Sequence, residues 1–92
     1  MEKRDELQEL RTEIDLIDRN IITSLAERME LVGEIGRYKA AHHMGALDEG
    51  RRDALLRQWI ETGKALSLPE DLLREIFEAI HRHSLTVEKK SK

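Results

Sequence analysis

Apolar residues recur at three- and four-residue steps along the N-terminal part of the chain, and polar residues fill the positions between them. No proline interrupts residues 5–41. This spacing is typical of one long amphipathic helix, predicted over 5–41, in which Gly33 and Gly36 mark either a close helix contact or a weak point. The apolar positions are Leu7, Leu10, Ile14, Ile17, Ile21, Leu25, Val32 and Ile35.

A second amphipathic stretch predicts a helix over 49–66. A loop precedes it from His42 onward, where Gly45 is the expected stop of the first helix. Asp48 is the expected N-cap of the second helix, because an aspartate side chain accepts hydrogen bonds from free N–H groups of a first turn.

A third helix is predicted over 69–88. Pro69 fits the first helical position, and Glu70 and Asp71 favour a first turn because a helix N-terminus carries partial positive charge. Its expected buried face consists of Leu73, Ile76, Phe77, Ile80 and Val87.

The lengths of the three predicted helices do not match. The first, at about 36 residues, would be roughly 54 Å long, whereas the other two would be roughly 27 and 30 Å and, as a hairpin, would cover about half of it. A second copy of the chain is the simplest cover for the remaining apolar face. We therefore expect an all-α fold in which one long and two shorter helices form an intertwined homodimer.

Composition narrows the function classes. The 92 residues predict a single domain, 1–92, and contain no cysteine, which excludes disulfides, a thiolate nucleophile and metal sites built on cysteine. A net charge of −3 argues against a broad nucleic-acid surface. Neither a secretory leader nor an apolar run of roughly 18 residues is seen, so a cytoplasmic protein with no membrane partner is expected.

Cations interrupt the apolar face of the first helix. Steps of seven residues lead from Leu7 through Ile14 and Ile21 to Arg28, where another apolar residue is expected. Lys39 follows eleven residues later, about three turns on, and shares nearly the same azimuth. Two cations are thus predicted to line one strip beside apolar neighbours.

The other helices carry similar interruptions. Arg11 borders the buried strip of the first helix, and Arg51 shares the apolar face of the second. On the third helix, Ser84 and Glu88 continue the apolar strip with a hydroxyl and a carboxyl group. Single cations of this kind commonly snorkel to the surface, but four inward cations require an anion. Guanidinium groups favour planar carboxylates or phosphates, so an anionic small molecule is the expected ligand.

In these residues the chain resembles the all-helical, AroQ-class chorismate mutases over nearly its full length. The segments that carry the resemblance are Leu10-Arg11 with Ile14-Asp15-x-x-Asp18, Leu25-Ala26-Glu27-Arg28, Ile35-Gly36-x-x-Lys39, Asp48-x-x-Arg51 and Ser84-x-x-x-Glu88. Each segment alone is unspecific, whereas five in this order and at these spacings are quite specific. The resemblance implies an intertwined homodimer that converts chorismate to prephenate in phenylalanine and tyrosine biosynthesis.

The resemblance also implies roles for the substrate's two carboxylates. Arg28 would bind one of them, and Arg11 would reach across from the other subunit to bind it or its partner. Arg51 would assist at this end of the substrate, and Ser84 would help to shape it.

At the reacting end, the resemblance implies that Lys39 donates to the ether oxygen while Glu88 faces that oxygen from the other side. Asp48 would contact the ring hydroxyl through its backbone. The reaction is a one-step Claisen rearrangement without a covalent intermediate, so no cofactor or metal is expected. The enzyme would select the reactive conformer and stabilise the charge that develops on the oxygen.

The chain departs from the family pattern at two positions. Where Glu88 stands, the family commonly has glutamine, so Glu88 must be protonated to donate and activity should decline as pH rises. Where Arg52 stands, the family usually has an acid that binds the ring hydroxyl. Either Asp48 or Asp53 replaces that contact after a small shift of the helix start, or the affinity for substrate is lower.

Two other functions remain open at this stage. An isochorismate-pyruvate lyase of the same fold would share Arg11, Arg28 and Lys39, and a non-catalytic helical dimerisation module would use none of them. A histidine metal site is not expected, because His42 and His43 are adjacent and cannot face one ion from a regular helix.

Overall fold

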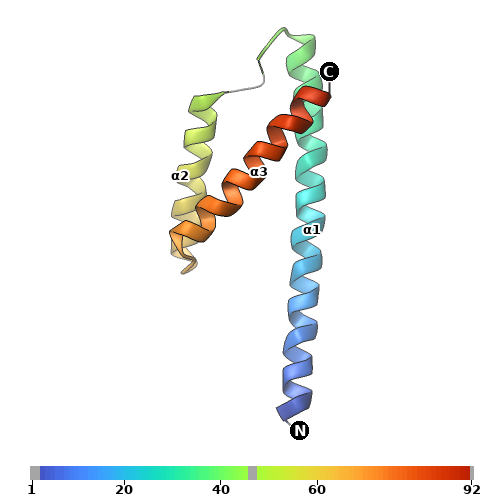
Figure 1. Cartoon of the computed structure of the whole chain (residues 1–92), viewed down its shortest axis with the longest axis vertical. Coiled ribbons are helices and arrows are strands. Elements are labelled where there is room, and N and C mark those ends of the chain that lie inside the picture. Colours follow the sequence, from blue (N-terminus) through green and yellow to red (C-terminus); the bar gives the residue numbers. More distant parts are fainter. Residues whose placement is uncertain (1–2, 46–47, 92) are drawn as a thin grey trace. The chain divides into compact units, whose positions relative to one another are not determined.

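The computed structural model describes residues 3–45 and 48–91 (Figure 1). These residues form helices α1 (Lys3–Ala41), α2 (Glu49–Ala65) and α3 (Glu70–Lys90), and no strand occurs among them. The chain divides into two compact units, residues 1–31 and 32–92. The all-α prediction with one long and two shorter helices is confirmed. No helix in the described part of the chain has the length of apolar sequence needed to cross a membrane.

The first unit contains the predicted apolar face of α1 as far as Leu25. Five of these side chains are exposed in the single chain, and their exposed fractions lie close to one half. They are Leu7 at 47%, Leu10 at 57%, Ile14 at 55%, Ile17 at 57% and Ile21 at 53%. The first unit therefore has no apolar core of its own along this face.

α1 ends at Ala41 in a Schellman motif. The Met44 N–H donates to the Lys39 carbonyl at 2.8 Å, and the His43 N–H donates to the Ala40 carbonyl at 3.3 Å. His43 provides the left-handed residue of the motif, with φ of 55°. The prediction that Gly45 stops this helix is wrong, because the chain turns two residues earlier. Of the predicted loop, residues 46–47 lie outside the described part of the chain.

α2 begins as predicted and ends one residue early. Asp48 is its N-cap, with an extended backbone and a side chain that accepts a hydrogen bond from the Arg51 N–H at 3.0 Å. At the other end, Leu66 is the C-cap and Ser67 is left-handed, with φ of 64°. The Leu68 N–H donates to the Gly63 carbonyl at 2.9 Å, so this is a second Schellman motif.

α3 begins one residue later than predicted and ends two residues later. Pro69 is its N-cap rather than its first helical residue, because its ψ of 142° is extended. Glu70 follows it and accepts a hydrogen bond from Arg74 Nε at 3.0 Å, which lowers the pKa of Glu70, with a further contribution from Lys64. At the far end, Ser91 Oγ donates to the Val87 carbonyl at 2.8 Å.

α2 and α3 pack together as a hairpin in the second unit (Figure 1). Phe77 is 1% exposed, and its ring makes a T-shaped contact with the Trp59 ring at 5.6 Å between centroids. Nearer the turn, Gly63 lets Leu73 approach so closely that a Cβ at position 63 would overlap the Leu73 side chain. Phe77 is thus a core residue of the hairpin, as predicted, and Trp59 packs against it.

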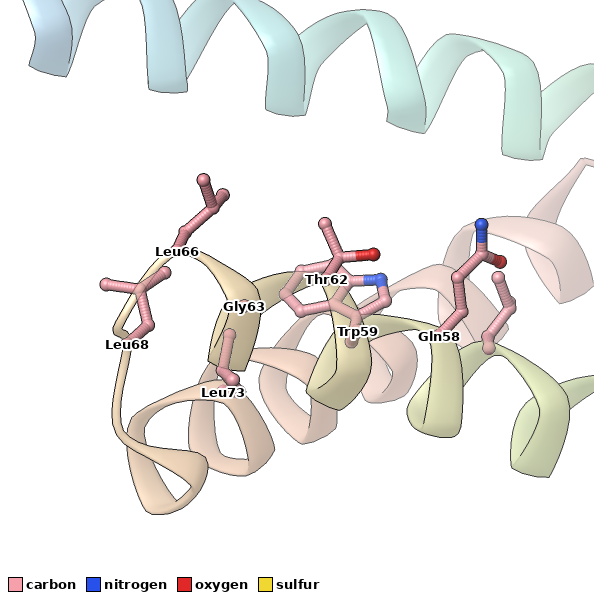
Figure 2. Close-up of a pocket in the computed structure, with 8 residues that line it drawn as sticks. Gln58, Trp59, Thr62, Gly63, Leu66, Leu68 and Leu73 are labelled. Atoms are coloured by element: carbon pink, nitrogen blue, oxygen red, sulfur yellow. The ribbon is translucent and has the colours of Figure 1, made fainter.

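An apolar groove of about 380 Å³ lies at the turn end of this hairpin. Figure 2 shows its lining along α2 and the following turn, with Leu66 and Leu68 at one end and Gln58 at the other. None of the cations singled out in the sequence lines it. The groove is therefore separate from the residues predicted to bind an anion.

Candidate functional site

Lys39 and Glu88 meet where the C-terminal end of α1 packs against the C-terminal end of α3. Lys39 Nζ lies 2.7 Å from Glu88 Oε1, and the two side chains are only 19% and 11% exposed. Apart from this ion pair, the buried Oε1 accepts no hydrogen bond from the residues that the structure describes. A charge pair so poorly hydrated is costly to bury, which marks it as a candidate functional group.

A cavity of about 280 Å³ opens beside this ion pair. Both charged side chains line it, so a small molecule in the cavity would contact an ammonium and a carboxyl group at once. The lining consists of Gly36, Lys39, Ala40, Met44, Gly45, Glu88 and Lys89.

Ser84 lies one turn before Glu88 on α3. It is 7% exposed, and the four-residue spacing places it on the same face of the helix as Glu88. The predicted strip of Ser84 and Glu88 on the inner face of the third helix is therefore present.

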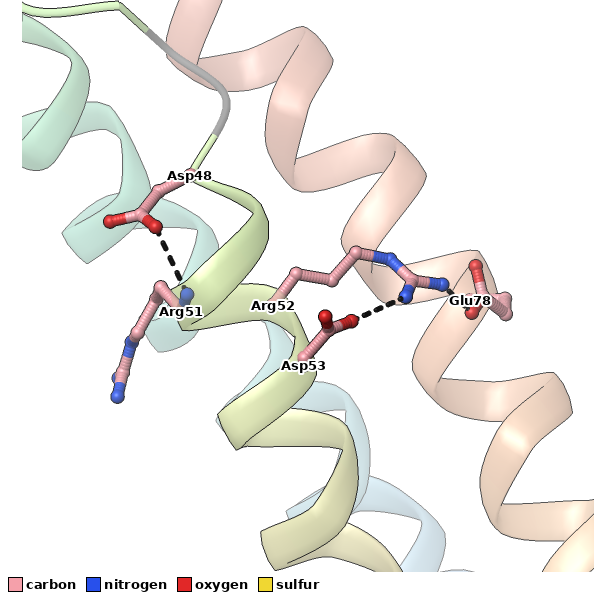
Figure 3. A network of polar contacts seen from close by, with 5 residues as sticks. All are labelled: Asp48, Arg51, Arg52, Asp53 and Glu78. Carbon is pink, nitrogen blue, oxygen red and sulfur yellow. Dashed lines mark hydrogen bonds and ion pairs between the residues drawn. The ribbon is translucent and has the colours of Figure 1, made fainter.

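Asp48 and Arg51 occupy the exposed first turn of α2. The Asp48 carboxylate caps the helix through the Arg51 N–H, while the Arg51 side chain extends away from α3 (Figure 3). The cap fixes the position of the first turn and engages one Asp48 side-chain oxygen. The backbone role expected for Asp48 stays a prediction.

Arg52 points to α3 and forms an ion pair with Glu78, and its second terminal nitrogen lies 3.4 Å from Asp53 Oδ1 (Figure 3). The hydrogen bond to Glu78 raises the pKa of Arg52 above its ordinary value. Its guanidinium carbon also stands 5.8 Å from the centre of the Phe77 ring. Position 52, where the family usually has an acid, therefore holds an arginine whose charge is neutralised by Glu78 of α3.

The two candidate replacements for that acid are both engaged elsewhere. Asp48 caps α2, and Asp53 lies against Arg52. The ring-hydroxyl contact predicted for one of them is untested.

The remaining predicted cations lie on α1 within the first unit. Arg11 is exposed, and Arg28 is of intermediate exposure and has polar or electrostatic interactions of its own. By contrast, the second unit contains the other predicted site residues, which are Lys39, Asp48, Arg51, Ser84 and Glu88.

Residues 10–89 match the family model described as chorismate mutase type II. The chain belongs to the chorismate mutase type II family. The matched range includes all seven predicted site residues, from Arg11 to Glu88. The resemblance inferred from the five sequence segments is thereby confirmed.

Relatives of known description agree with this membership. The chain is 32% identical to the T-protein of Enterobacter agglomerans over 90% of its own length, and 34% identical to the T-protein of Haemophilus influenzae over 85%. It is 33% identical over 92% of its length to the bifunctional chorismate mutase/prephenate dehydratase of Escherichia coli. It spans only 22%, 21% and 22% of these proteins, about a fifth of each, so the similarity concerns one part of longer proteins.

Sequence reasoning missed Glu78 as a partner for Arg52. The sequence shows that Arg52 and Glu78 carry opposite charges and lie on the second and third predicted helices. Which charges face each other across a hairpin depends on how the two helices are rotated and offset, and that information is not contained in the periodicity of either one.

Proposed function

We propose that this chain is a chorismate mutase that rearranges chorismate to prephenate. The observation that carries the proposal is the ion pair of Lys39 and Glu88 beside a small cavity, with 2.7 Å between Nζ and Oε1. Membership of the chorismate mutase type II family supports it. So does the printed description of the Escherichia coli relative, which names a chorismate mutase activity.

The proposed chemistry requires electrostatic stabilisation and no nucleophile. In the Claisen rearrangement a C–O bond breaks as a C–C bond forms, and negative charge grows on the ether oxygen. The Lys39 ammonium has three N–H donors, so one can keep its contact with Glu88 while another donates a hydrogen bond to the ether oxygen. Low exposure of the pair strengthens this interaction, because little water competes for the donors.

We assign the substrate's carboxylates to the arginines. Arg28 binds one carboxylate and Arg11 of a second copy of the chain binds it or its neighbour, while Arg51 assists at the same end. Guanidinium groups suit this task because they donate two parallel hydrogen bonds to a planar carboxylate. Ser84 shapes this end of the site, and the Asp48 backbone contacts the ring hydroxyl.

The proposed active form is an intertwined homodimer. Support comes from the apolar face of α1, where residues such as Ile14 and Ile17 are more than half exposed in the single chain. A partner copy that covers this face would remove a large apolar surface from water and would bring its Arg11 to the site.

The decisive experiment is an assay with chorismate on the purified protein and on Lys39→Ala. Removal of a donor to a developing oxyanion typically lowers turnover by about 10²–10³-fold, and we expect a loss of that size. The matched control is Lys64→Ala, which removes an exposed lysine paired with Glu70 on the protein surface and should leave turnover unchanged. A Lys39→Ala variant within tenfold of the parent would refute the assigned role.

The same assay separates the alternatives. Release of pyruvate from isochorismate, without turnover of chorismate, would identify a lyase. A protein that neither turns over these compounds nor gains thermal stability from a bicyclic transition-state analogue would be a non-catalytic module.

A further inference from the structure

Gly36 is packed directly against the backbone of Glu88. A Cβ atom built on Gly36 would lie 2.5 Å from the Glu88 carbonyl oxygen and 2.9 Å from the Glu88 Cα. Non-bonded heavy atoms do not approach so closely, and the obstacle is backbone, which cannot rotate away as a side chain can. Any side chain at position 36 therefore forces α1 and α3 apart at this point.

Gly33 stands one turn earlier on the same helix and differs in this respect. A Cβ there would lie 3.4 Å from Ser91 Oγ and 4.0 Å from Val87 Cγ1. Both are ends of side chains near the end of α3, so alanine at 33 fits with at most a small adjustment. α1 thus contains two glycines, of which only Gly36 is required by the packing against α3.

Gly36 also lies one turn before Lys39, on the same face of α1. The contact that its missing side chain permits is with Glu88, the partner of Lys39 in the ion pair. The Glu88 backbone faces Gly36, and the Glu88 carboxyl faces Lys39. Gly36 and Lys39 of α1 therefore both contact Glu88 of α3, one at its backbone and the other at its carboxyl group.

We propose that Gly36 is a positioning residue that sets the separation between the Lys39 ammonium and the Glu88 carboxyl group. This inference rests on the proposed mutase function, in which both groups face the ether oxygen. Added bulk at position 36 displaces the ends of α1 and α3, so the two groups no longer reach one oxygen atom together. Substrate carboxylates are bound by other residues, so the displacement lowers kcat more than it raises KM.

The test compares Gly36→Ala with Gly33→Ala in chorismate turnover and thermal unfolding. Alanine normally stabilises a helix interior relative to glycine, so Gly33→Ala should raise the melting temperature by a few degrees and leave kcat near that of the parent. Gly36→Ala should lower the melting temperature and reduce kcat by about 10- to 100-fold, the loss expected from misplacing catalytic groups by about 1 Å. Its KM should stay within about threefold.

Turnover is measured at a temperature at which circular dichroism shows each variant fully folded, and sedimentation checks that the assembly state is unchanged. A Gly36→Ala variant that keeps kcat within about twofold of Gly33→Ala overturns the proposal. Equal losses in kcat and in the affinity for substrate also overturn it, because they indicate general damage to the site.

A second measurement uses the parent protein, so it does not depend on whether Gly36→Ala folds. Nuclear Overhauser spectra should show a strong contact between the Hα protons of Gly36 and the Hα proton of Glu88, and absence of this contact overturns the proposal. An inactive parent refutes the proposed function and the catalytic part of this inference. The melting comparison and the spectra then report on the helix contact alone.

Discussion

At position 88 a carboxyl group stands where the family pattern commonly has an amide, and the structure pairs it with an ammonium. Lys39 and Glu88 are 2.7 Å apart and largely shielded from water. In an ion pair the carboxyl group carries no proton, whereas donation to an ether oxygen requires one. A carboxylate at position 88 therefore does not donate to that oxygen, whereas an amide does.

Glu88→Gln provides the matched comparison at the same position. An amide donates to the ether oxygen where a carboxylate does not, so this variant should turn over chorismate faster than the parent. Turnover of Glu88→Gln equal to or below that of the parent would contradict this role for position 88.

At the scale of helices, two Schellman motifs determine where α1 and α2 end. The left-handed residues are His43 at φ of 55° and Ser67 at φ of 64°. Such a backbone conformation costs residues with a Cβ roughly 1–2 kcal/mol, and glycine avoids this cost. Neither helix has glycine at this left-handed position, although glycine suits the conformation best.

Ser67→Gly and His43→Gly should therefore each stabilise the protein by about 0.5–1 kcal/mol, after subtraction of the greater backbone entropy of glycine in the unfolded chain. Urea unfolding of each variant measures the difference. Alanine at the same positions is the control, because it keeps the Cβ and should give no comparable gain. An equal gain from alanine would show that the left-handed conformation is not the cause.

The ion pair between the two helices of the hairpin contributes little to its stability. Arg52 and Glu78 link α2 to α3, but their side chains are 28% and 48% exposed, so water screens the pair. Burial of Phe77 against Trp59 is the stronger tie between the helices.

At the scale of the whole molecule, the exposed apolar face of α1 leads to the proposed homodimer. We expect sedimentation at micromolar concentration to give twice the 10.7 kDa mass of the chain. Ile14→Glu puts a charge on this face and should dissociate or unfold the protein, because a buried unpaired carboxylate costs several kcal/mol. A folded monomer of the parent would refute the dimer.

Thr12→Glu is the control for that variant. Thr12 lies nearly opposite Ile14 around α1, and its hydroxyl donates to the Gln8 carbonyl of its own helix. Thr12→Glu should therefore leave the mass measured by sedimentation unchanged. If both variants dissociate the protein alike, the predicted face is not the interface.

The prediction from sequence was most reliable where local interactions decide the outcome. Asp48 was identifiable as an N-cap because its hydrogen bond spans three residues. Gly45 was a wrong choice of helix stop, because glycine is only the preferred residue for a left-handed turn and His43 adopts that conformation instead. Pro69 was placed one position too far inside α3, because its fixed φ fits both the N-cap and the first helical residue.

The sequence by itself determined the three helices, their apolar faces and the positions at which charged residues interrupt those faces. Helical hydrogen bonds and side-chain periodicity act over a few residues, so they can be read along the chain. Only the tertiary structure decided that Lys39 and Glu88 form a direct ion pair, that Gly36 contacts the Glu88 backbone and that Glu78 neutralises Arg52. These contacts depend on the rotation and offset of packed helices, which arise from side-chain fit across the interface and not from the pattern of either helix.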